Sequence, residues 1–563
     1  MKKRSIRYFY MKTSFIVSWV PFRANLTINL IAYHSRGENI ERALNLLMLV
    51  IYLTLRRRET KIVQNCKCSF QRLCEVGMSE KLWNQKYLDA LKHGENAVKS
   101  TEGVITAFNT NIDALHFVRS GEVRKILEVN SDLEREVLRK LVTPPSKIER
   151  IADFLAGLLY AMRLGCGMEL TISRKETSEW IRSAFKIDEI RMGGQAGIMA
   201  NVLANLGVKN VHPHVSQLSS MQAELFVKSA SIKVPTFKEE KVIMEKPSRV
   251  FREKDEPLIH LVFEFSKGTR VKINSTTVVS PNSNRLIATW DEFNSRLSID
   301  SAFSIGTKRI IKNVDKAMIS GYQLLRRDYP DKTTYRDHVD NSVELISSWK
   351  KLNPKLKIHF EQAFLRDPEI IRYVFDEVFP YVDGFGVNEN ELCSILEAYG
   401  FNDLAKEIKS RFAAPCLYDG MEKLFDLIKV SRIDLHTRDF AISLLKPNYG
   451  ITPRTEQNAL LFGALCAATR ALTGQFGNLE EINNASASPR LHLNELGLKE
   501  HERFSRKVDT LGLSTKGEFF KSGIATADDH WIIYIVTKIT DNPVSTVGLG
   551  DCITAGLIVG EIE

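Results

Sequence analysis

The residues near the C-terminus have types and a spacing that suit phosphoryl transfer. Residues 545–557 read Ser-Thr-Val-Gly-Leu-Gly-Asp-Cys-Ile-Thr-Ala-Gly-Leu, so two glycines precede Asp551 and a run of small and apolar residues. This pattern predicts a tight turn that opens a helix. Backbone N–H groups at such a turn have no partner within the helix, and the helix dipole adds partial positive charge. The turn is therefore suited to a phosphate group or to a developing oxyanion.

Asp551 is an unusual residue for an anion-binding turn, because its carboxylate repels the ligand that the turn attracts. The position is explained if Asp551 accepts the proton of a hydroxyl that attacks a phosphoryl group, while the N–H groups hold the charge of that moving group. An acid in the first turn of a helix is also common without any catalytic role. This segment alone does not separate the two interpretations.

Two further polar segments are suited to gripping a small molecule. Residues 109–113, Asn-Thr-Asn-Ile-Asp, follow an apolar segment and place amides and a carboxylate at alternating positions. This arrangement suits the binding of sugar hydroxyls, but the segment taken alone favours an Asx-rich turn. Residues 191–197, Arg-Met-Gly-Gly-Gln-Ala-Gly, precede an apolar helix, and their glycines allow a ligand to approach the backbone closely.

Polar and acidic residues also stand at two further predicted strand ends. His359-Phe360-Glu361 ends one strand and places the histidine and the glutamate on the same face. Asn388 and Glu391 share a side at the start of a predicted helix. Their spacing suits water-mediated binding of Mg²⁺, and it also suits an N-cap with a capping-box acid.

The elements that must position these residues alternate between helix and strand from about residue 79. Helical patterns cover 81–97, 342–351 and 367–378, and buried strands are expected at 103–108, 317–321, 356–360 and 381–387. This order predicts βαβ units and a mainly parallel sheet, whose ligands bind beyond the carboxyl ends of the strands. Residues 258–273 instead predict a hairpin, with another strand at 276–279, which indicates a small second domain or lid.

The net charge of +10 is a property of the first 77 residues. Of 78 Lys and Arg and 68 Asp and Glu residues, segment 1–77 holds 14 and 4, which leaves 64 of each in the rest. We therefore expect neither nucleic acid nor an anionic membrane as a partner of residues 78–563. Eight cysteines without a CxxC pair argue against zinc and disulfides, and favour reduced thiols in a cytoplasmic protein.

Segment 1–77 differs from the rest in charge and pattern. Its apolar run at 43–55 is shorter than a membrane span, and it lacks the layout of a secretory signal. A membrane-touching segment is one interpretation. We favour another, in which 1–77 is a poorly ordered basic extension or lies outside the native protein, since Met78-Ser79-Glu80 resembles an ordinary protein start.

The ordered set of motifs resembles the ADP-dependent sugar kinases. These are the archaeal ADP-dependent glucokinases and phosphofructokinases of the ribokinase-like superfamily. The set runs from about Met78 to the last residue and comprises Asn-x-Asn-x-Asp, Gly-Gly-Gln, Asn-Arg-x-Ile at 284–287, Ser-Gly-Tyr-Gln at 320–323, His-x-Glu, Asn-x-x-Glu and the terminal Thr-Val-Gly-Leu-Gly-Asp. The resemblance implies an α/β fold: a ribokinase-like core, with a mainly parallel sheet flanked by helices, and a smaller α/β lid inserted discontinuously at about 113–190 and 258–291.

The resemblance also implies a role for each motif residue. Asp551 corresponds to the catalytic base, and Gly548, Leu549 and Gly550 to the anion hole. Sugar binding falls to Asn111, Asp113, Gly193, Gly194 and Gln195, nucleotide binding to His436, Thr437 and Val547, and a phosphate of nucleotide or sugar to Arg285. One or more Mg²⁺ ions are implied at Glu391, Glu361 and Asp551, with Asn388 acting through water. Cys552 departs from the family, in which threonine is usual after the catalytic aspartate.

The expected reaction is transfer of the β-phosphoryl group of ADP to fructose 6-phosphate, leaving AMP, in a modified glycolysis. Glu169 stands 24 residues before Gly193, where the family's glucokinases have a glutamate that binds a glucose hydroxyl, so we expect glucose to be accepted as well. A dedicated ADP-dependent glucokinase is the alternative. Less favoured are an ATP-dependent ribokinase-type kinase and a non-catalytic sugar or nucleotide sensor. We expect a cytoplasmic monomer or small homo-oligomer.

Overall fold

The computed structural model describes residues 18–19, 22–23 and 61–562, except 129, 144 and 275, with side chains from residue 79 onward. The chain divides into two compact units, Met1–Gly77 and Met78–Glu563, and the second contains every candidate site residue. Helix α2 spans Lys61–Ser100, so it begins upstream of the predicted start at residue 81. The expectations for 1–77, the apolar run at 43–55 included, mostly concern residues outside those described.

Within the described residues, nine strands form one large sheet. Six neighbouring strands, β17 to β7, run parallel, and β18, β21 and β20 extend the sheet by antiparallel pairing. Their order is β20 (Ile524–Thr526), β21 (Trp531–Val536), β18 (Phe440–Leu445), β17 (Arg432–His436), β16 (Gly384–Val387), β15 (Lys357–Glu361), β14 (Lys316–Ile319), β3 (Val104–Ala107) and β7 (Val211–Pro213). The apolar runs predicted as strands correspond to β3, β14, β15 and β16. The predicted fold class, α/β with a mainly parallel sheet, is confirmed.

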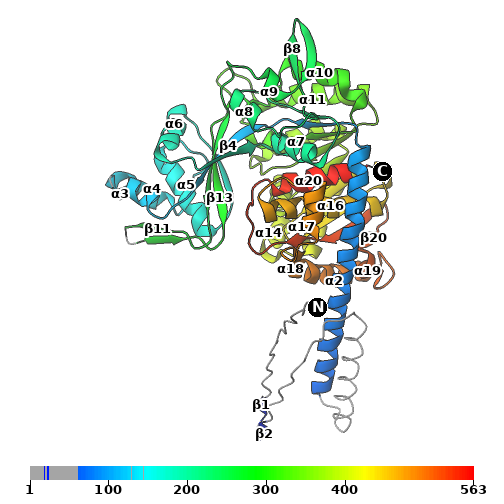
Figure 1. Cartoon of the computed structure of the whole chain (residues 1–563). Coiled ribbons are helices and arrows are strands. Elements are labelled where there is room, and N and C mark those ends of the chain that lie inside the picture. The colour runs from blue at the N-terminus through cyan, green and yellow to red at the C-terminus, as the bar shows by residue number, and fades with distance from the viewer. Residues whose placement is uncertain are drawn as a thin grey trace, which may run out of the picture. The chain divides into compact units, whose positions relative to one another are not determined.

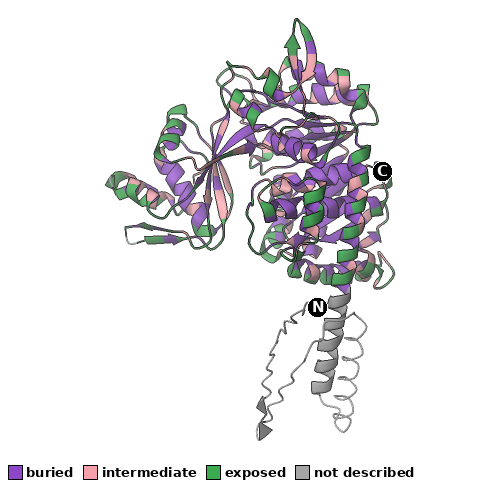
Figure 2. Ribbon diagram, in the orientation of Figure 1, coloured by how far each residue is buried: buried purple, intermediate pink, exposed green. Residues whose placement is uncertain are grey.

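Helices flank this sheet, and most of its strand residues are buried (Figures 1 and 2). Helices α11 (Tyr335–Leu352), α12 (Pro368–Val378), α13 (Glu389–Ala398), α14 (Asn402–Arg411) and α15 (Ala414–Ile428) pack in succession. Helices α7 (Gln195–Leu206), α16 (Pro453–Thr473) and α20 (Leu549–Gly560) form another group, in which α20 packs against both of the others.

A close crossing of α16 and α20 positions the helix that carries Asp551. A Cβ atom on Gly463 would lie 2.4 Å from the backbone oxygen of Ile553, and one on Gly556 would lie 2.8 Å from Cα of Gly463. Only glycine allows the two backbones to approach this closely. The glycines of the apolar C-terminal helix therefore set where its first turn lies.

A second sheet lies between helices α3 to α6 and the rest of the unit (Figure 1). In the described chain it has five strands in the order β5 (Met168–Thr171), β13 (Asn284–Thr289), β10 (Ile259–Phe265), β4 (Asn111–Phe117) and β6 (Glu189–Gly193). The helices are α3 (Glu122–Glu128), α4 (Ser131–Lys140), α5 (Ile151–Leu164) and α6 (Lys175–Ala184). They share a separate hydrophobic core with the sheet, in which Phe154, Phe185 and Phe263 pack ring against ring.

The hairpin predicted at 258–273 is wrong. Strand β10 pairs in parallel with β4 and antiparallel with β13, whereas β11 (Arg270–Ile273) pairs with β12 (Thr276–Val279). The turn residues after β10 indicated a local partner, but the apolar face of β10 is buried between strands far away in the sequence. Strand β4 was missed because its polar beginning, Asn111-Ile112-Asp113, was interpreted as following a strand.

The connections between the two sheets are tied together by buried polar side chains. Asn294, which follows β13, donates from Nδ2 to the backbone oxygen of Thr110 at 3.1 Å, just before β4 begins. Asp291 accepts hydrogen bonds from the backbone N–H groups of Phe293 and Asn294 and pairs with His260 at 2.9 Å. The segments that enter and leave the smaller sheet thus share one hydrogen-bonded junction. Of the described helices, none contains a stretch long and apolar enough to cross a membrane.

Candidate active site

Residues from both sheets meet where the central parallel strands of the large sheet end. Glu361 is the last residue of β15, His436 is the last residue of β17, and Asn388 directly follows β16. The first turn of α20 carries Asp551. Ligands of open parallel sheets bind at this edge, so the topology brings together the motifs that are spread over the sequence.

Asp551 lies in the turn that the sequence predicted. Gly548 is the N-cap residue of α20 with φ 73°, a left-handed conformation that favours glycine. The N–H groups of Leu549, Gly550 and Asp551 have no acceptor within their own helix, as in any first helical turn. Burial of the carboxyl group, together with repulsion from Glu361 and Asp113, raises the pKa of Asp551 to about 7, against the attraction of His436 and Arg285.

This electrostatic environment has two consequences. A carboxylate with a pKa near 7 is a stronger base than an ordinary aspartate at neutral pH. The charges that act on Asp551 also come from both sheets, since Glu361 and His436 belong to the large sheet and Asp113 and Arg285 to the smaller one. Asp551 therefore lies close to charged residues of both sheets.

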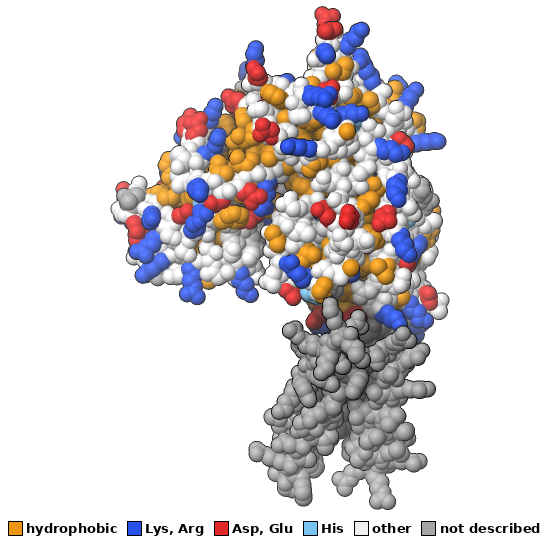
Figure 3. All heavy atoms as spheres, in the orientation of Figure 1, with side chains coloured by type: hydrophobic (Ala, Val, Ile, Leu, Met, Phe, Trp, Pro, Cys, Tyr) orange, Lys and Arg blue, Asp and Glu red, His pale blue; other side chains and the backbone are white. Residues whose placement is uncertain are grey.

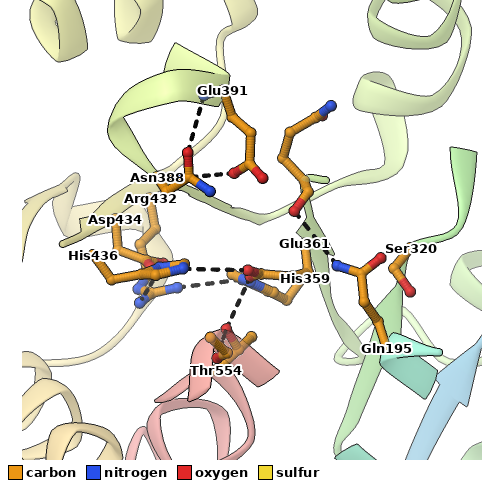
Figure 4. A network of polar contacts seen from close by, with 12 residues as sticks. Gln195, Ser320, His359, Glu361, Asn388, Glu391, Arg432, Asp434, His436 and Thr554 are labelled. Carbon is orange, nitrogen blue, oxygen red and sulfur yellow. Dashed lines mark hydrogen bonds and ion pairs between the residues drawn. The ribbon is translucent and has the colours of Figure 1, made fainter. Parts of the chain in front are cut away.

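Glu361 is held by contacts on several sides (Figure 4). Its Oε2 atom lies 3.1 Å from Nε2 of His359 and accepts a hydrogen bond from Thr554 on α20 at 2.9 Å. Its Oε1 atom lies 3.6 Å from Nε2 of His436. A Cβ atom on Gly386 of the neighbouring strand would lie 2.3 Å from Oε2, so this strand position must be glycine for Glu361 to occupy its place.

His436 lies beside the turn that carries Asp551. Burial disfavours its charged form, but Asp434 and Glu361 outweigh burial and raise the pKa of His436 to about 9. A Cβ atom on Gly550 would lie 3.5 Å from its Nε2 atom. The adjacent Thr437 uses its hydroxyl to close the turn into β18, donating to the backbone oxygen of Phe440 at 2.8 Å.

Asn388 and Glu391 form a capping box, which was one of the two interpretations of their spacing in the sequence. Oδ1 of Asn388 accepts from the backbone N–H of Glu391 at 3.0 Å, and Oε2 of Glu391 accepts from the N–H of Asn388 at 2.8 Å. Burial and repulsion from Glu361 and Glu389 raise the pKa of Glu391 to about 8. Within the described residues, no group of three or more His, Cys, Asp or Glu side chains is arranged to hold a metal ion directly.

Asn111 and Asp113 lie on one face of β4, next to the glycine pair of β6 and α7. Asn111 donates to Oδ1 of Asp113 at 2.8 Å. A Cβ atom on Gly193 would lie 2.1 Å from that same oxygen, and Gly194, with φ 75°, approaches the backbone oxygen of Asn109. The side chains of the Asn-x-Asn-x-Asp motif therefore fit only because the neighbouring positions 193 and 194 are glycines. Neither sequence pattern alone indicated this contact.

Strands β5, β10 and β13 add Glu169, His260 and Arg285 to this face. Glu169 accepts a hydrogen bond from Thr289 at 3.2 Å. Burial and, to a smaller extent, Glu169 raise the pKa of Asp113 to about 6, against the opposing effect of His260 and Arg285. Sequence reasoning missed His260, which stands beside Asp113 in the register of β10 and β4. The available signal was a histidine in a strand whose other residues, except Glu264, are apolar.

Sequence reasoning also missed two arginines near Arg285. Arg285 stands opposite Glu264 in the antiparallel register of β13 and β10. Burial raises the pKa of Glu264, and Arg191, Arg285 and Arg470 all act against that rise. Arg191 forms an ion pair with Glu189, and Arg470 stacks on Phe476 with its guanidinium carbon 4.3 Å from the ring centroid.

Several buried amide oxygens at this edge have no hydrogen-bond partner in the part of the chain that the structure describes. They belong to Asn109, Asn111, Gln195, Gln323 and Gln362. The amide nitrogen of Gln195 donates to the backbone oxygen of Gln362 at 3.4 Å, next to Glu361 (Figure 4). Because buried polar atoms are costly to leave unpaired, this set fits a ligand with several hydroxyl groups.

The family model described as "ADP-specific Phosphofructokinase/Glucokinase conserved region" matches residues 102–560. An ADP-specific phosphofructokinase of Methanosarcina acetivorans is 31% identical over 480 residues, which cover 85% of this chain and 96% of the relative. An ADP-dependent glucose/glucosamine kinase of Pyrococcus abyssi is 32% identical over 484 residues, covering 85% and 99%. A solved structure described as an ADP-dependent kinase complex with fructose-6-phosphate and ADPbetaS has a TM-score of 0.75 at 30% identity, covering 85% of this chain and 98% of that chain.

Proposed function

Because the chain belongs to the family of ADP-specific phosphofructokinases and glucokinases, we propose that it transfers the β-phosphoryl group of ADP to fructose 6-phosphate and also to glucose. The products are fructose 1,6-bisphosphate or glucose 6-phosphate, together with AMP. The observation that carries this proposal is the position of Asp551, a buried carboxyl group whose pKa is also affected by charged residues of both sheets. A base at this position can serve an acceptor on one side and a phosphoryl donor on the other.

Asp551 accepts the proton of the attacking hydroxyl, which is the C1 hydroxyl of fructose 6-phosphate or the C6 hydroxyl of glucose. Deprotonation strengthens the oxygen as a nucleophile while the phosphoryl group moves in line. The N–H groups of Gly548, Leu549 and Gly550 form the anion hole for the charge on that group. The pKa of about 7 for Asp551 means that the base is available at neutral pH.

The sugar lies against the smaller sheet. Asn111, Asp113 and Gln195 bind its hydroxyls, and the absence of side chains at Gly193 and Gly194 lets it reach the backbone. The unpaired buried oxygens of Asn111 and Gln195 support this assignment. The smaller sheet with its helices, residues 113–190 and 258–291 approximately, acts as a lid that excludes water when both substrates are bound.

The nucleotide lies on the side of β17 and the turn before α20. His436, Thr437 and Val547 line that side, and His436 brings a positive charge toward the phosphates. Arg285 binds a phosphate as well. Arg285 lies on β13 of the smaller sheet, and Arg191 and Arg470 act together with it on the pKa of Glu264. This group of three cations supports the 6-phosphate of the sugar, rather than a phosphate of the nucleotide, as the ligand of Arg285.

The chemistry of the acidic side chains fits Mg²⁺. Burial and repulsion from Glu361 raise the pKa values of Glu391 and Asp551, and a divalent cation would relieve this repulsion. Mg²⁺ usually keeps several waters and is bound by one or two carboxylates plus substrate phosphates, which agrees with the lack of a direct three-ligand set within the described residues. Glu391 and Glu361, with Asn388 through water, would hold it, and it would neutralise phosphate charge during transfer.

Glu169 is the residue that supports glucose as a second acceptor, since it lies on the same face of the smaller sheet as Asp113 and its charge acts on the pKa of Asp113. A dedicated ADP-dependent glucokinase is the second candidate, and Glu169 is the observation in its favour. We place the enzyme in the cytoplasm as a monomer or small homo-oligomer without a nucleic-acid partner. Both signs of charge are spread over the visible face of residues 78–562, in agreement with their balanced composition (Figure 3).

The proposal is tested by measuring AMP release from ADP and ADP release from ATP, with each acceptor in turn. We expect AMP release with fructose 6-phosphate and, at lower kcat/KM, with glucose. Turnover of ADP with glucose alone would favour the dedicated glucokinase. Turnover of ATP alone, or none with any pair in a folded protein, would contradict the proposal.

A further inference from the structure

A closed ring of five polar side chains lies beside the catalytic turn (Figure 4). Going round the ring, Nη1 of Arg432 lies 3.3 Å from Nδ1 of His359, and Nε2 of His359 lies 3.1 Å from Oε2 of Glu361. Oε1 of Glu361 lies 3.6 Å from Nε2 of His436, and Nδ1 of His436 lies 3.6 Å from Asp434. Asp434 closes the ring with an ion pair to Nη2 of Arg432 at 2.9 Å. Of these members, only His359, Glu361 and His436 belong to motifs that the sequence singled out.

Strand β16 lies between the two strands that carry the ring, and it has glycines where a side chain would collide with ring members. The ring members come from β15 and β17, and β16 lies between these strands. A Cβ atom on Gly384 would lie 3.3 Å from Nη1 of Arg432, and one on Gly386 would lie 3.0 Å from Nε2 of His359. Residues two apart on a strand share a face, so Gly384 and Gly386 clear one face of β16 for the ring.

The donors and acceptors of the ring determine the tautomer of His359. A guanidinium has only N–H donors and stays charged, so Nδ1 of His359 must accept from Arg432. The ring proton of a neutral His359 then lies on Nε2, which donates to Oε2 of Glu361. Because Oε2 also accepts from Thr554, this oxygen is fully engaged and Oε1 is the one left facing the site.

Arg432 is itself fixed on every side. Its side chain is 0% exposed, and its Nε atom lies 2.9 Å from Glu456 on α16 and 3.2 Å from Glu561 after α20. Glu561 also accepts from the hydroxyl of Tyr449 at 2.6 Å and pairs with Lys316. Arg432 thus connects β17, α16 and the C-terminal end of the helix whose first turn carries Asp551.

We propose that Arg432 is a positioning residue for phosphoryl transfer: it fixes the Nε2–H tautomer of His359, which in turn holds Glu361 with one carboxylate oxygen directed into the site. Arg432 touches neither substrate and acts through His359. This inference rests on the proposed function, because it assigns Glu361 to the phosphoryl side of that reaction. Lysine at this position would keep a charge but lose the planar fork that reaches three carboxylates and an imidazole together.

The first test concerns His359 itself and needs neither substrate nor metal ion. The full chain is labelled with ¹⁵N at its 12 histidines, and the signals of His359 are identified by their loss in His359→Gln. We expect the Nε2–H tautomer in the wild-type protein and a mixture of tautomers in Arg432→Lys. A predominantly Nδ1–H ring in the wild-type protein would overturn the proposal.

The second test measures turnover in Arg432→Lys. We expect kcat to fall about 10- to 100-fold, the range for residues that orient a ligand-binding side chain from behind, with KM for the sugar changed by less than about threefold. Arg454→Lys is the matched control, since Arg454 lies on α16, the helix whose Glu456 pairs with Arg432, and forms only an exposed ion pair with Asp89 at 3.1 Å outside its own helix. It should behave as wild type. An unchanged kcat in folded Arg432→Lys would contradict the proposal.

A pair of variants at His359 decides the matter if Arg432→Lys does not fold. His359→Gln keeps an acceptor for Arg432 and a donor for Glu361, whereas His359→Leu keeps neither. We expect kcat of His359→Leu to be at least about tenfold below that of His359→Gln, and equal values would overturn the proposal. Failure of the proposed function would show separately, as wild-type protein that releases no AMP, and would leave the tautomer result intact.

Discussion

The two sheets contribute to the site in different ways. On the large sheet, Glu361 and His436 belong to a ring of contacts that passes through the fully buried Arg432. On the smaller sheet, Asp113 accepts from Asn111 and Glu169 accepts from Thr289, and neighbouring amide oxygens are unpaired within the described chain. The large sheet is thus preorganised for charge stabilisation, while the smaller one is completed by its ligand.

The relatives of this chain include proteins named as phosphofructokinases and as glucose/glucosamine kinases. Under the proposed assignment, the smaller sheet selects the acceptor and the buried ring serves every acceptor alike. We therefore expect substitutions on the large sheet to reduce kcat for every acceptor. Substitutions on the smaller sheet should change KM for one acceptor at a time.

The largest expected effect is that of Asp551→Asn. Asparagine fills the same space but cannot accept the proton of the attacking hydroxyl, so we expect kcat to fall by at least about a hundredfold with both acceptors. The thermal midpoint should stay near that of wild type, as measured by circular dichroism. A variant that kept a tenth of wild-type kcat would remove Asp551 from its role as the base.

Arg285→Gln sharpens the comparison on the smaller sheet. Loss of a charged hydrogen bond to the 6-phosphate should raise KM for fructose 6-phosphate about 10- to 100-fold and leave KM for glucose nearly unchanged. Initial rates with both acceptors measure this split. Arg270→Gln, an exposed cation on β11, is the control and should have no effect. An equal rise in KM for both acceptors would mean that Arg285 does not bind the 6-phosphate.

Glu169→Ala should act in the opposite direction. Loss of the carboxylate removes a hydrogen bond to a glucose hydroxyl, so kcat/KM for glucose should fall about tenfold, while that for fructose 6-phosphate changes by less than about threefold. Glu179→Ala on the exposed surface of α6 is the matched control. A larger loss with fructose 6-phosphate than with glucose would contradict the assignment.

The smallest expected effect is on stability. Since Glu391 has a pKa of about 8 in the folded chain, against 4.5 for an unperturbed glutamate, the folded state binds its proton more tightly than the unfolded state does. The favourable contribution of this proton is complete below about pH 4.5 and is lost as the pH rises through about 8. Substrate-free and metal-free protein should therefore lose stability in this interval.

Glu391→Gln tests that loss because glutamine keeps the capping box and cannot ionise. We expect its thermal midpoint to exceed that of wild type by about 1–3 °C at pH 8.5 and to match it at pH 5. Calorimetry at the two pH values measures the difference. A gain of the same size at both would show that the charge of Glu391 is not the cause.

Short-range patterns were sufficient to predict much of the fold. The apolar runs at β3, β14, β15 and β16 are buried on both sides, so their sequences alone indicate strands. The pairing of β10 with β4 could not be predicted in this way, because the partners are far apart in the sequence and the nearby turn favoured a hairpin. Arg432 was missed for a related reason, since nothing near it in the sequence indicates contact with His359.

The central claim is that Asp551 takes a sugar proton while the β-phosphoryl group of ADP moves to the same oxygen. A single turnover with ADP carrying ³²P in its β-phosphoryl group, with excess enzyme and either acceptor, tests this claim most directly. We predict that the label appears on the sugar, that AMP is unlabelled, and that Asp551→Asn transfers almost none in the same time. Label that stays on the nucleotide, or that appears as inorganic phosphate whether or not sugar is present, would contradict the account.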